Sequence, residues 1–435
     1  MSSLCPHNAN DNNRHHEPSG PVLSRRNFML GASVASSAVA LAACSNAVTA
    51  STDSSAEQAA DPQLHLTTAT VPFDGEHQAG VDTPGQAHVN VIAFSLRAGN
   101  NAESVSRLLK LWTEDARRLT QGENPLGSLE PEMTTTPANL TITCGFGPRF
   151  FDIIGKPEQR PEWLAPLPKF SEDKLDPAWG DSDIVLQVCC DDPVTLAFAT
   201  RHMHRAAVDF AQIQWMQQGF LTANGSRKPE STPRNLFGQL DGTVNPRKDE
   251  EYDDYVWINS TKQAPKWAQG GTCMVVRRIN MDLDRWEILD RFSREESMGR
   301  FLHNGAPLTG TDEFDPADFE ARDDYGLPVI DPRSHMALAA PAANEPKQRM
   351  RRRAYNYDEA PIPGSDQSSN AGLIFICFQQ NPLTQFVPIQ QRLNDGDRLN
   401  EWITHIGSAV YVIPPGTSEN ESTRDTYWGQ SLLES

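Results

Sequence analysis

The spacing of apolar side chains divides the first folded half of the chain into strands and helices. Residues 88–96 (HVNVIAFSL) alternate apolar and polar side chains, which is typical of a half-buried strand. Residues 103–121 place apolar side chains three or four positions apart, which predicts an amphipathic helix. By the same two periods we predict strands at 139–146, 183–190 and 212–221 and a second helix at 193–211. The order strand, helix, strand, strand, helix, strand is that of a ferredoxin-like fold.

The same order of elements repeats in the second half. Strands are expected at 271–283, 348–357, 372–380 and 408–414, with helices after residue 284 and within 382–405. Residues 305–346, rich in Pro and Asp, form a long insertion, and such insertions are usually functional or disordered. We therefore predict an α+β protein of two ferredoxin-like domains with antiparallel sheets, at residues 64–245 and 246–435.

The first 63 residues carry an export signal and a tether. Residues 24–30 (SRRNFML) contain a twin arginine, and the mildly apolar stretch that follows is too short to span a membrane. The stretch ends in Leu41-Ala42-Ala43-Cys44, the pattern of a bacterial lipobox, in which Cys44 would become a lipid-anchored first residue. The alternative is cleavage after a small-x-small site at 38–40. We assign 1–44 to the signal and 45–63 to a disordered tether, and expect twin-arginine export of the folded protein to the periplasm or cell envelope.

Charge and cysteine content narrow the possible partners. The 435 residues carry a formal charge of −19, which argues against nucleic acid because phosphate recognition depends on basic side chains. Seven cysteines occur without a CxxC pair. Five of them lie in strand-like apolar runs, so we interpret these as small buried hydrophobes and not as a disulfide or zinc framework.

Two residues stand out as candidate polar site groups. Asp241 lies between two glycines in GQLDG (238–242), which would let a flat ligand approach the backbone; the alternative is an ordinary Asp-Gly turn. His335 lies in the insertion with apolar neighbours that could cover a flat ring, and imidazole is a usual axial ligand of haem iron. The alternative is a loop histidine in water. Other histidines that remain candidates are His77, His88, His303 and His405.

The arginine-rich segment 349–357 (RMRRRAYNY) adds a third candidate. Strand alternation places Arg352 on a face with small or apolar neighbours, Met350 and Ala354. A lone guanidinium on such a face must be paired or used. The arginines of the opposite face, Arg349, Arg351 and Arg353, are more typical of a solvated basic strip.

Five collinear groups of residues carry a resemblance to a known family. They are GQLDG within NLFGQLDGTVNP, FDGEHQAG at 73–80, Gly299-Arg300 with GAPL at 305–308, Ser334-His335, and RRAY at 352–355. The chain resembles the dye-decolorizing peroxidases, in particular the exported bacterial branch that includes deferrochelatase/peroxidases, over about residues 70–430. This resemblance implies a pair of ferredoxin-like domains of the dimeric α/β-barrel type, with one haem b per chain held mainly by the C-terminal domain.

The resemblance also assigns site residues. His335 would be the proximal ligand to the iron, and Asp241 and Arg352 would lie on the distal side. Residues expected near the haem are Gly242, Thr243 and Val244, with Arg300 near a propionate. The chain departs from the family in 337–342, where ALAAPA replaces Arg-Leu-Ala-Asn-Pro-Arg, and in RRAY, which replaces RRGY.

The function implied is reduction of hydrogen peroxide with oxidation of an organic donor, such as a dye, a phenol or a porphyrinogen. Asp241 would relay the proton and Arg352 would stabilise the charge that develops as the O–O bond breaks. One alternative is a deferrochelatase that removes iron from haem and leaves the porphyrin intact. Another is a non-enzymatic haem-binding lipoprotein, which needs His335 but neither Asp241 nor Arg352. Export and family together also imply iron-uptake proteins and a second copy of the chain as candidate partners.

Overall fold

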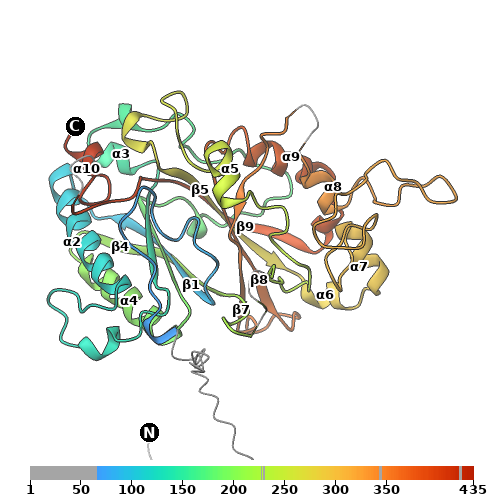
Figure 1. Ribbon diagram of the computed structural model, residues 1–435, viewed down its shortest axis with the longest axis horizontal. Helices are drawn as coiled ribbons and strands as arrows, with labels where there is room; N and C mark the ends of the chain where they lie inside the picture. Colours follow the sequence, from blue (N-terminus) through green and yellow to red (C-terminus); the bar gives the residue numbers. More distant parts are fainter. Residues whose placement is uncertain (1–65, 227, 229–230, 342–344, 421–423) are drawn as a thin grey trace, which may run out of the picture. The chain divides into compact units, whose positions relative to one another are not determined.

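The computed structural model describes residues 66–226, 228, 231–341, 345–420 and 424–435, all of which belong to one unit, Ala59–Ser435 (Figure 1). The twin-arginine segment, Cys44 and the expected tether lie outside the described residues. Within the described part of the chain, no helix has both the length and the apolar composition needed to cross a bilayer.

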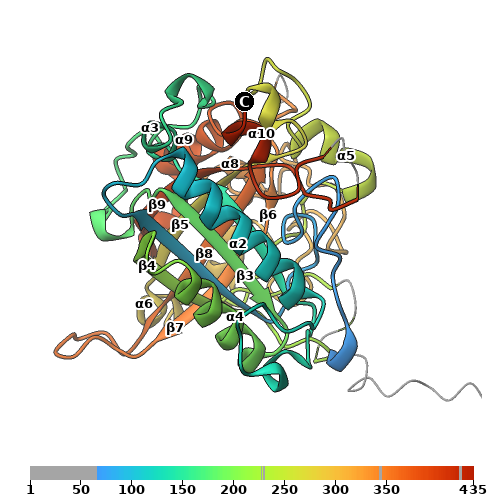
Figure 2. The same cartoon turned by 90° about the vertical axis from the view of Figure 1, so that its left-hand side faces the viewer.

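The first half forms a four-stranded antiparallel sheet in the order β2-β3-β1-β4. Helices α2 and α4 cross one face of this sheet (Figure 2), where the indole of Trp112 donates to the carbonyl of Met203 at 2.8 Å. Helix α4 begins as predicted, with Asp192 as its N-cap and Pro193 in its first turn. The elements are β1 His88–Leu96, α2 Ala102–Thr120, β2 Thr141–Phe146, α3 Phe150–Ile153, β3 Ile184–Cys190, α4 Pro193–Ala206 and β4 Ala211–Phe220.

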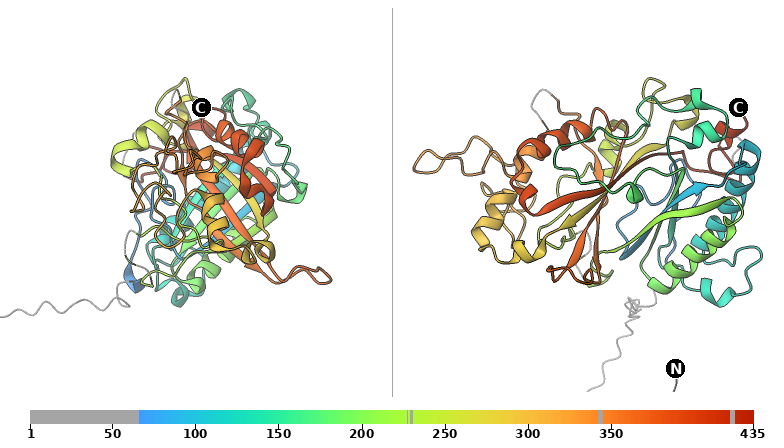
Figure 3. Two further views of the ribbon diagram at one scale, coloured as in Figure 1. Left: turned by 90° about the vertical axis from the view of Figure 1, so that its right-hand side faces the viewer. Right: turned by 180° about the vertical axis from the view of Figure 1, so that it is seen from behind.

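The second half repeats this order as β9-β5-β8-β7, so the ferredoxin-like prediction is confirmed for both halves. In Figure 3 the orange and red helices α8 and α9 cover a face of the second sheet. The elements are α5 Lys248–Tyr255, β5 Thr272–Met281, α6 Leu283–Glu287, α7 Arg291–Met298, α8 His335–Ala339, β6 Arg351–Arg352, β7 Tyr355–Glu359, β8 Asn370–Gln379, α9 Phe386–Gly396, β9 Ile403–Ile413 and α10 Gln430–Leu433. Short 3-10 helices lie at η1 Pro131–Thr134, η2 Pro157–Gln159, η3 Pro177–Trp179, η4 Lys266–Ala268 and η5 Arg398–Glu401.

Two short contacts join the sheets edge to edge. Phe146 of β2 pairs with Val412 of β9, and Phe220 of β4 pairs with Asn356 of β7. Because β5 pairs with both β8 and β9, these bridges close the strands into a ring. A buried apolar cluster that draws on strands of both sheets fills one side of this ring and includes Val91, Trp215, Met274 and Tyr411. The strands of the two halves therefore belong to one closed sheet.

The structure corrects several local predictions. The expected strand at 348–357 is divided in the structure into two shorter strands, β6 Arg351–Arg352 and β7 Tyr355–Glu359. Arg353 is buried and donates to Tyr355 Oη at 2.7 Å, so its assignment to a solvated strip is wrong. Arg349 is also paired, with Glu251. The last strand begins at Ile403 and not at 408, which places His405 inside β9.

The cysteine interpretation is confirmed. The five cysteines of the strand-like runs are free and buried: Cys144, Cys189, Cys190, Cys273 and Cys377. Burial raises the pKa of the Cys190 thiol to about 12, and the pKa values of the Cys144 and Cys377 thiols are shifted upward by the same cause. These side chains therefore serve as small apolar residues of the sheets.

Candidate functional site

Asp241 and Arg352 form an ion pair in the second half. Nη1 of Arg352 donates to Oδ1 of Asp241 at 3.1 Å, and the two side chains remain 27% and 16% exposed, respectively. The loop that carries Asp241 is a turn, because Gly238 and Gly242 both have positive φ, at 82° and 132°. The N–H of Asp241 donates to the carbonyl of Pro233 at 2.9 Å. The predicted turn is therefore present, and it presents the carboxylate of Asp241 to the guanidinium of Arg352.

Asn245 fixes the backbone of Arg352 from the same loop. Its Nδ2 donates to the carbonyl of Arg352 at 2.8 Å, and its Oδ1 accepts the N–H of Arg352 at 2.9 Å. Strand β6 has only two residues, and these two side-chain hydrogen bonds take the place of backbone bonds from a neighbouring strand. One loop therefore carries the acid and also holds the arginine that faces it. Sequence reasoning missed Asn245, although it lies four residues after Asp241.

The insertion is tied to this loop through Glu313. Oε1 of Glu313 accepts from the hydroxyl of Thr243 at 2.8 Å and also from the hydroxyl of Thr232. Its backbone carbonyl accepts from Nη1 of Arg300 at 3.0 Å, and the same nitrogen donates to Gly305. Burial and the nearby charge of Arg352 lower the pKa of Arg300. The Thr243 hydroxyl and the Arg300 guanidinium are therefore both hydrogen-bonded to other groups of the protein.

His335 is the first residue of α8, whose N-cap is Ser334. Its Nδ1 donates to Oδ2 of Asp397 at 2.6 Å, and Asp397 is buried. Burial opposes protonation of the imidazole, but the Asp397 carboxylate outweighs it and raises the pKa of His335. A proton on Nδ1 leaves the lone pair on Nε2, and Nε2 has no hydrogen-bond partner among the described residues.

The three predicted residues lie in one charged region of the second half. The charges of Arg352 and Asp241 both influence the pKa of His335, which places them within electrostatic reach of its ring. They come from three separate segments: the loop before α5, the start of α8 and β6. Val244, by contrast, is 57% exposed, and Gly242 lies at the turn.

The other candidate histidines occupy different surroundings. His77 stacks on Trp257 with ring centroids 3.7 Å apart, and His88 begins β1. The backbone carbonyl of His303 accepts a hydrogen bond from Nη2 of Arg234, which precedes Asp241 in the same loop. His405 is buried in β9, and burial is the main cause of the lowering of its pKa.

The residues around His335 fit a flat iron-containing cofactor. Nε2 is a free ligand atom, and none of the five residues of α8 is fully buried although α7 and α9 lie beside it. Ala339 of α8, Phe375 of β8 and Leu393 of α9 are partly buried apolar residues that border one hydrophobic core. Helix α8 therefore leaves apolar side chains partly open beside Nε2 of His335, and this nitrogen would hold the iron of a haem bound there.

Two family models match the chain. The one described as "Dyp-type peroxidase, N-terminal" covers residues 78–221, and "Dyp-type peroxidase, C-terminal" covers 232–418. The chain belongs to the DyP-type peroxidase family. It is therefore a haem peroxidase, and the predictions of family, fold class and enzymatic activity are confirmed.

Relatives of DyP type span the described chain. A dye-decolorizing peroxidase of Thermobifida fusca is 37% identical over 94% of this chain and 97% of its own, and a deferrochelatase of Escherichia coli is 33% identical over 83% and 87%. The structure of a DyP-type peroxidase from Cellulomonas bogoriensis is 45% identical, covers 85% of this chain and 99% of its own, and has a TM-score of 0.80. A Rhodococcus jostii DypB variant in complex with heme shares the fold at 18% identity over 78% of this chain and 95% of its own, with a TM-score of 0.58.

The DyP family models divide between residues 221 and 232, so the Asp241 loop lies in the C-terminal one. The division at 245/246 stays a prediction, as do the roles of the site residues. Sequence reasoning also missed Asp397. Its position 62 residues after His335, directly after helix α9, gives no local motif that would have revealed it.

Proposed function

We propose that the chain reduces hydrogen peroxide at one haem b, with Nε2 of His335 as the axial ligand and Asp241 and Arg352 on the peroxide side. The observation that carries this proposal is the Asp241–Arg352 pair within electrostatic reach of a histidine whose Nε2 is free. The haem, when bound, supplies the iron and holds the oxidising equivalents taken from peroxide. The protein supplies the ligand, the proton relay and the electrostatic field.

Asp241 is the proton carrier in this proposal. As a carboxylate it takes the proton from the near oxygen of peroxide and returns it to the far oxygen, which leaves as water. Arg352 stabilises the negative charge on the departing oxygen. Their contact at 3.1 Å orients the carboxylate and the guanidinium toward each other, so both groups are in place before peroxide arrives.

Asp397 and Arg392 support the ligand side. Asp397 orients the imidazole and makes Nε2 a stronger donor to iron. In the segment where the chain departs from its family, Arg392 of α9 donates to the carbonyls of Leu338 and Ala340 at 2.9 and 3.0 Å. An arginine from another element thus anchors this segment. We place Arg300, together with the loop residues Gly242, Thr243 and Val244, at the haem edge.

A spectroscopic experiment tests the proposal. Protein produced with haem available should show a haem absorption band that changes within milliseconds of mixing with peroxide and returns when a phenol or dye is added. Loss of the band in His335→Ala would support the ligand assignment. An unchanged haem spectrum in that variant would reject it.

Removal of iron from intact haem is the second candidate, favoured by the E. coli relative named deferrochelatase. Incubation with haem under reducing conditions should then release fluorescent protoporphyrin. A peroxidase without this activity releases none. Because the chain belongs to a family of peroxidases, the non-enzymatic haem-binding lipoprotein is no longer a candidate.

We further propose that the folded chain leaves the cytoplasm by the twin-arginine route and is held at the cell envelope through lipidated Cys44. The motifs SRRNFML and LAAC support this proposal. Cys44→Ser should move the protein from the detergent phase to the aqueous phase, whereas cleavage at the small-x-small site predicts no change.

A further inference from the structure

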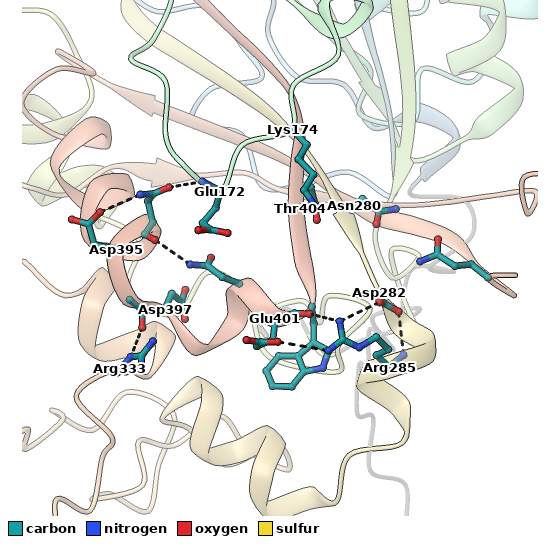
Figure 4. A pocket seen from close by; sticks show the side chains of 15 residues that line it. Glu172, Lys174, Asn280, Asp282, Arg285, Arg333, Asp395, Asp397, Glu401 and Thr404 are labelled. Atoms are coloured by element: carbon teal, nitrogen blue, oxygen red, sulfur yellow. Dashed lines mark hydrogen bonds and ion pairs between the residues drawn. The ribbon is translucent and has the colours of Figure 1, made fainter. Parts of the chain in front are cut away.

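A polar pocket opens behind the Asp397 carboxylate. It has a volume of about 550 Å³ and lies between residues 172–174, the ends of β5 and β9, and the segment 394–402 (Figure 4). Asp397 is part of its lining and also bonds Nδ1 of His335. One buried side chain therefore separates the pocket from the imidazole. We call this the Asp397 pocket.

Two charged groups at the Asp397 pocket have no side-chain partner among the described residues. Glu172 and Lys174 are exposed, and no other described residue hydrogen-bonds to or ion-pairs with the Glu172 carboxylate or the Lys174 ammonium. Arg285, in contrast, is held between Asp282 and Glu401, as Figure 4 shows. The Glu172 carboxylate and the Lys174 ammonium are therefore available to bind a ligand.

The lining combines a net negative charge with one flat apolar side chain. Its five carboxylates and three cationic side chains give a formal charge of −2. Trp402, which is half-buried, adds an indole that packs edge-on against Trp286 with ring centroids 5.2 Å apart. A suitable ligand therefore has a flat ring for the indole, a hydroxyl for the polar rim, and no negative charge.

We propose that the Asp397 pocket binds the reducing substrate, and that this substrate is a small phenol with a neutral or cationic substituent. The inference rests on the peroxidase function proposed above. Each phenol gives one electron to the peroxide-oxidised enzyme and its hydroxyl proton to a pocket carboxylate such as Glu172, leaving a phenoxyl radical. Two phenols thereby return the two equivalents that one peroxide removed, and their two protons, exchanged through solvent, convert the second peroxide oxygen to water.

The position of the pocket explains how two substrates avoid competing. Peroxide is handled by Asp241 and Arg352, whereas the pocket reaches the His335 ring through Asp397. Electrons have a short hydrogen-bonded route of 2.6 Å between the carboxylate and the imidazole. The acidic lining selects against sulfonated dyes, which must use another surface.

A matched pair of phenols tests the inference. Tyramine and para-hydroxyphenylacetate share a phenol and differ in the charge of the side chain. In the wild-type enzyme, tyramine should have the lower KM. The informative quantity is the KM for para-hydroxyphenylacetate divided by the KM for tyramine. In Glu172→Lys/Asp395→Lys this ratio should fall about tenfold, because opposite charges now line the pocket. The ratio does not depend on the fraction of active protein.

The control variant is Glu130→Lys/Glu132→Lys, which changes the net charge equally at exposed positions outside the pocket. An unchanged ratio in the pocket variant, or an equal fall in the control, would overturn the proposal. Calorimetry of tyramine with the resting enzyme reports pocket binding without peroxide, and binding should weaken only in the pocket variant. Stopped-flow mixing with peroxide alone separately reports the peroxidase function, so the two failures are distinguishable.

Discussion

The imidazole of His335 and the carboxylate of Asp397 meet at 2.6 Å, and the same carboxylate caps the 3-10 helix η5. Oδ2 accepts from the ring, while Oδ1 accepts the N–H of Leu399 at 2.9 Å. Because both oxygens are engaged and the side chain is buried, Asp397 cannot swing away from the ring. The orientation of the His335 imidazole is therefore set by the segment that follows α9.

Asp397→Asn keeps the shape of this contact and removes its charge. We expect the apo-protein to bind haem about 10- to 100-fold more weakly, because the second partner of a histidine ligand sets its orientation and basicity. Haem titration followed by absorption measures the affinity. Asp395→Asn, at an exposed carboxylate two residues away, is the control and should bind as wild type. Equal affinities for all three proteins would show that Asp397 does not position the ligand.

Asp241→Asn and Arg352→Leu test the two groups on the peroxide side. Loss of a proton carrier typically slows a reaction about 10²- to 10⁴-fold, and loss of a charge-stabilising donor about 10²- to 10³-fold. Stopped-flow absorption with haem-loaded protein measures the rate of the peroxide step. Both variants should keep the resting haem spectrum, since neither residue is the proposed ligand. Rates equal to wild type in both variants would remove these residues from the mechanism.

Asn245→Ala removes the two contacts that hold the backbone of Arg352. We expect the peroxide step to slow about 10- to 100-fold, because a small displacement of a catalytic group is costly. If Asn245 acts only through Arg352, adding Asn245→Ala to Arg352→Leu should cause little further loss. Additive losses in this cycle would show an independent, structural role. Asn224→Ala, at an exposed asparagine outside the site, is the control.

The fold could be predicted from the sequence because its elements are local. Alternation and helical spacing predicted the long strands of both halves and the helices α2, α4 and α9, but not the short helices α3, α5, α8 and α10. The glycines of GQLDG predicted a turn, and Gly238 and Gly242 both have positive φ. The closure of the two sheets depends instead on short edge contacts such as Phe146 with Val412. Such contacts between distant residues leave no periodic signal.

Only those candidate site residues that lie in short recognisable motifs could be predicted from the sequence. Asp241, His335 and Arg352 each lie in a recognisable segment, and the structure pairs Asp241 with Arg352 at 3.1 Å. The burial of Arg353 could not be foreseen, because its partners, including Gln86 and Cys189, come from the first half. Alternation alone therefore assigned it to the wrong environment.

His405 gives a prediction for the pH dependence of stability. Burial, together with the charges of Arg277 and His335, lowers the pKa of His405 well below its ordinary value. The unfolded chain therefore binds a proton that the folded chain does not, and stability is lost as the pH falls below about 6.5. Above that pH the contribution is constant.

Urea unfolding of the apo-protein at pH 7.5 and 5.5 measures this loss. Between pH 7.5 and 5.5, protonation of His405 in the unfolded chain lowers the free energy of unfolding by about 1.4 kcal/mol. His405→Gln should abolish that part of the difference. Any packing cost of the substitution is the same at both pH values, so the difference isolates the titration. His88→Gln, at the start of β1, should keep the wild-type difference. An undiminished acid loss in His405→Gln would show that the protonation of another group destabilises the fold.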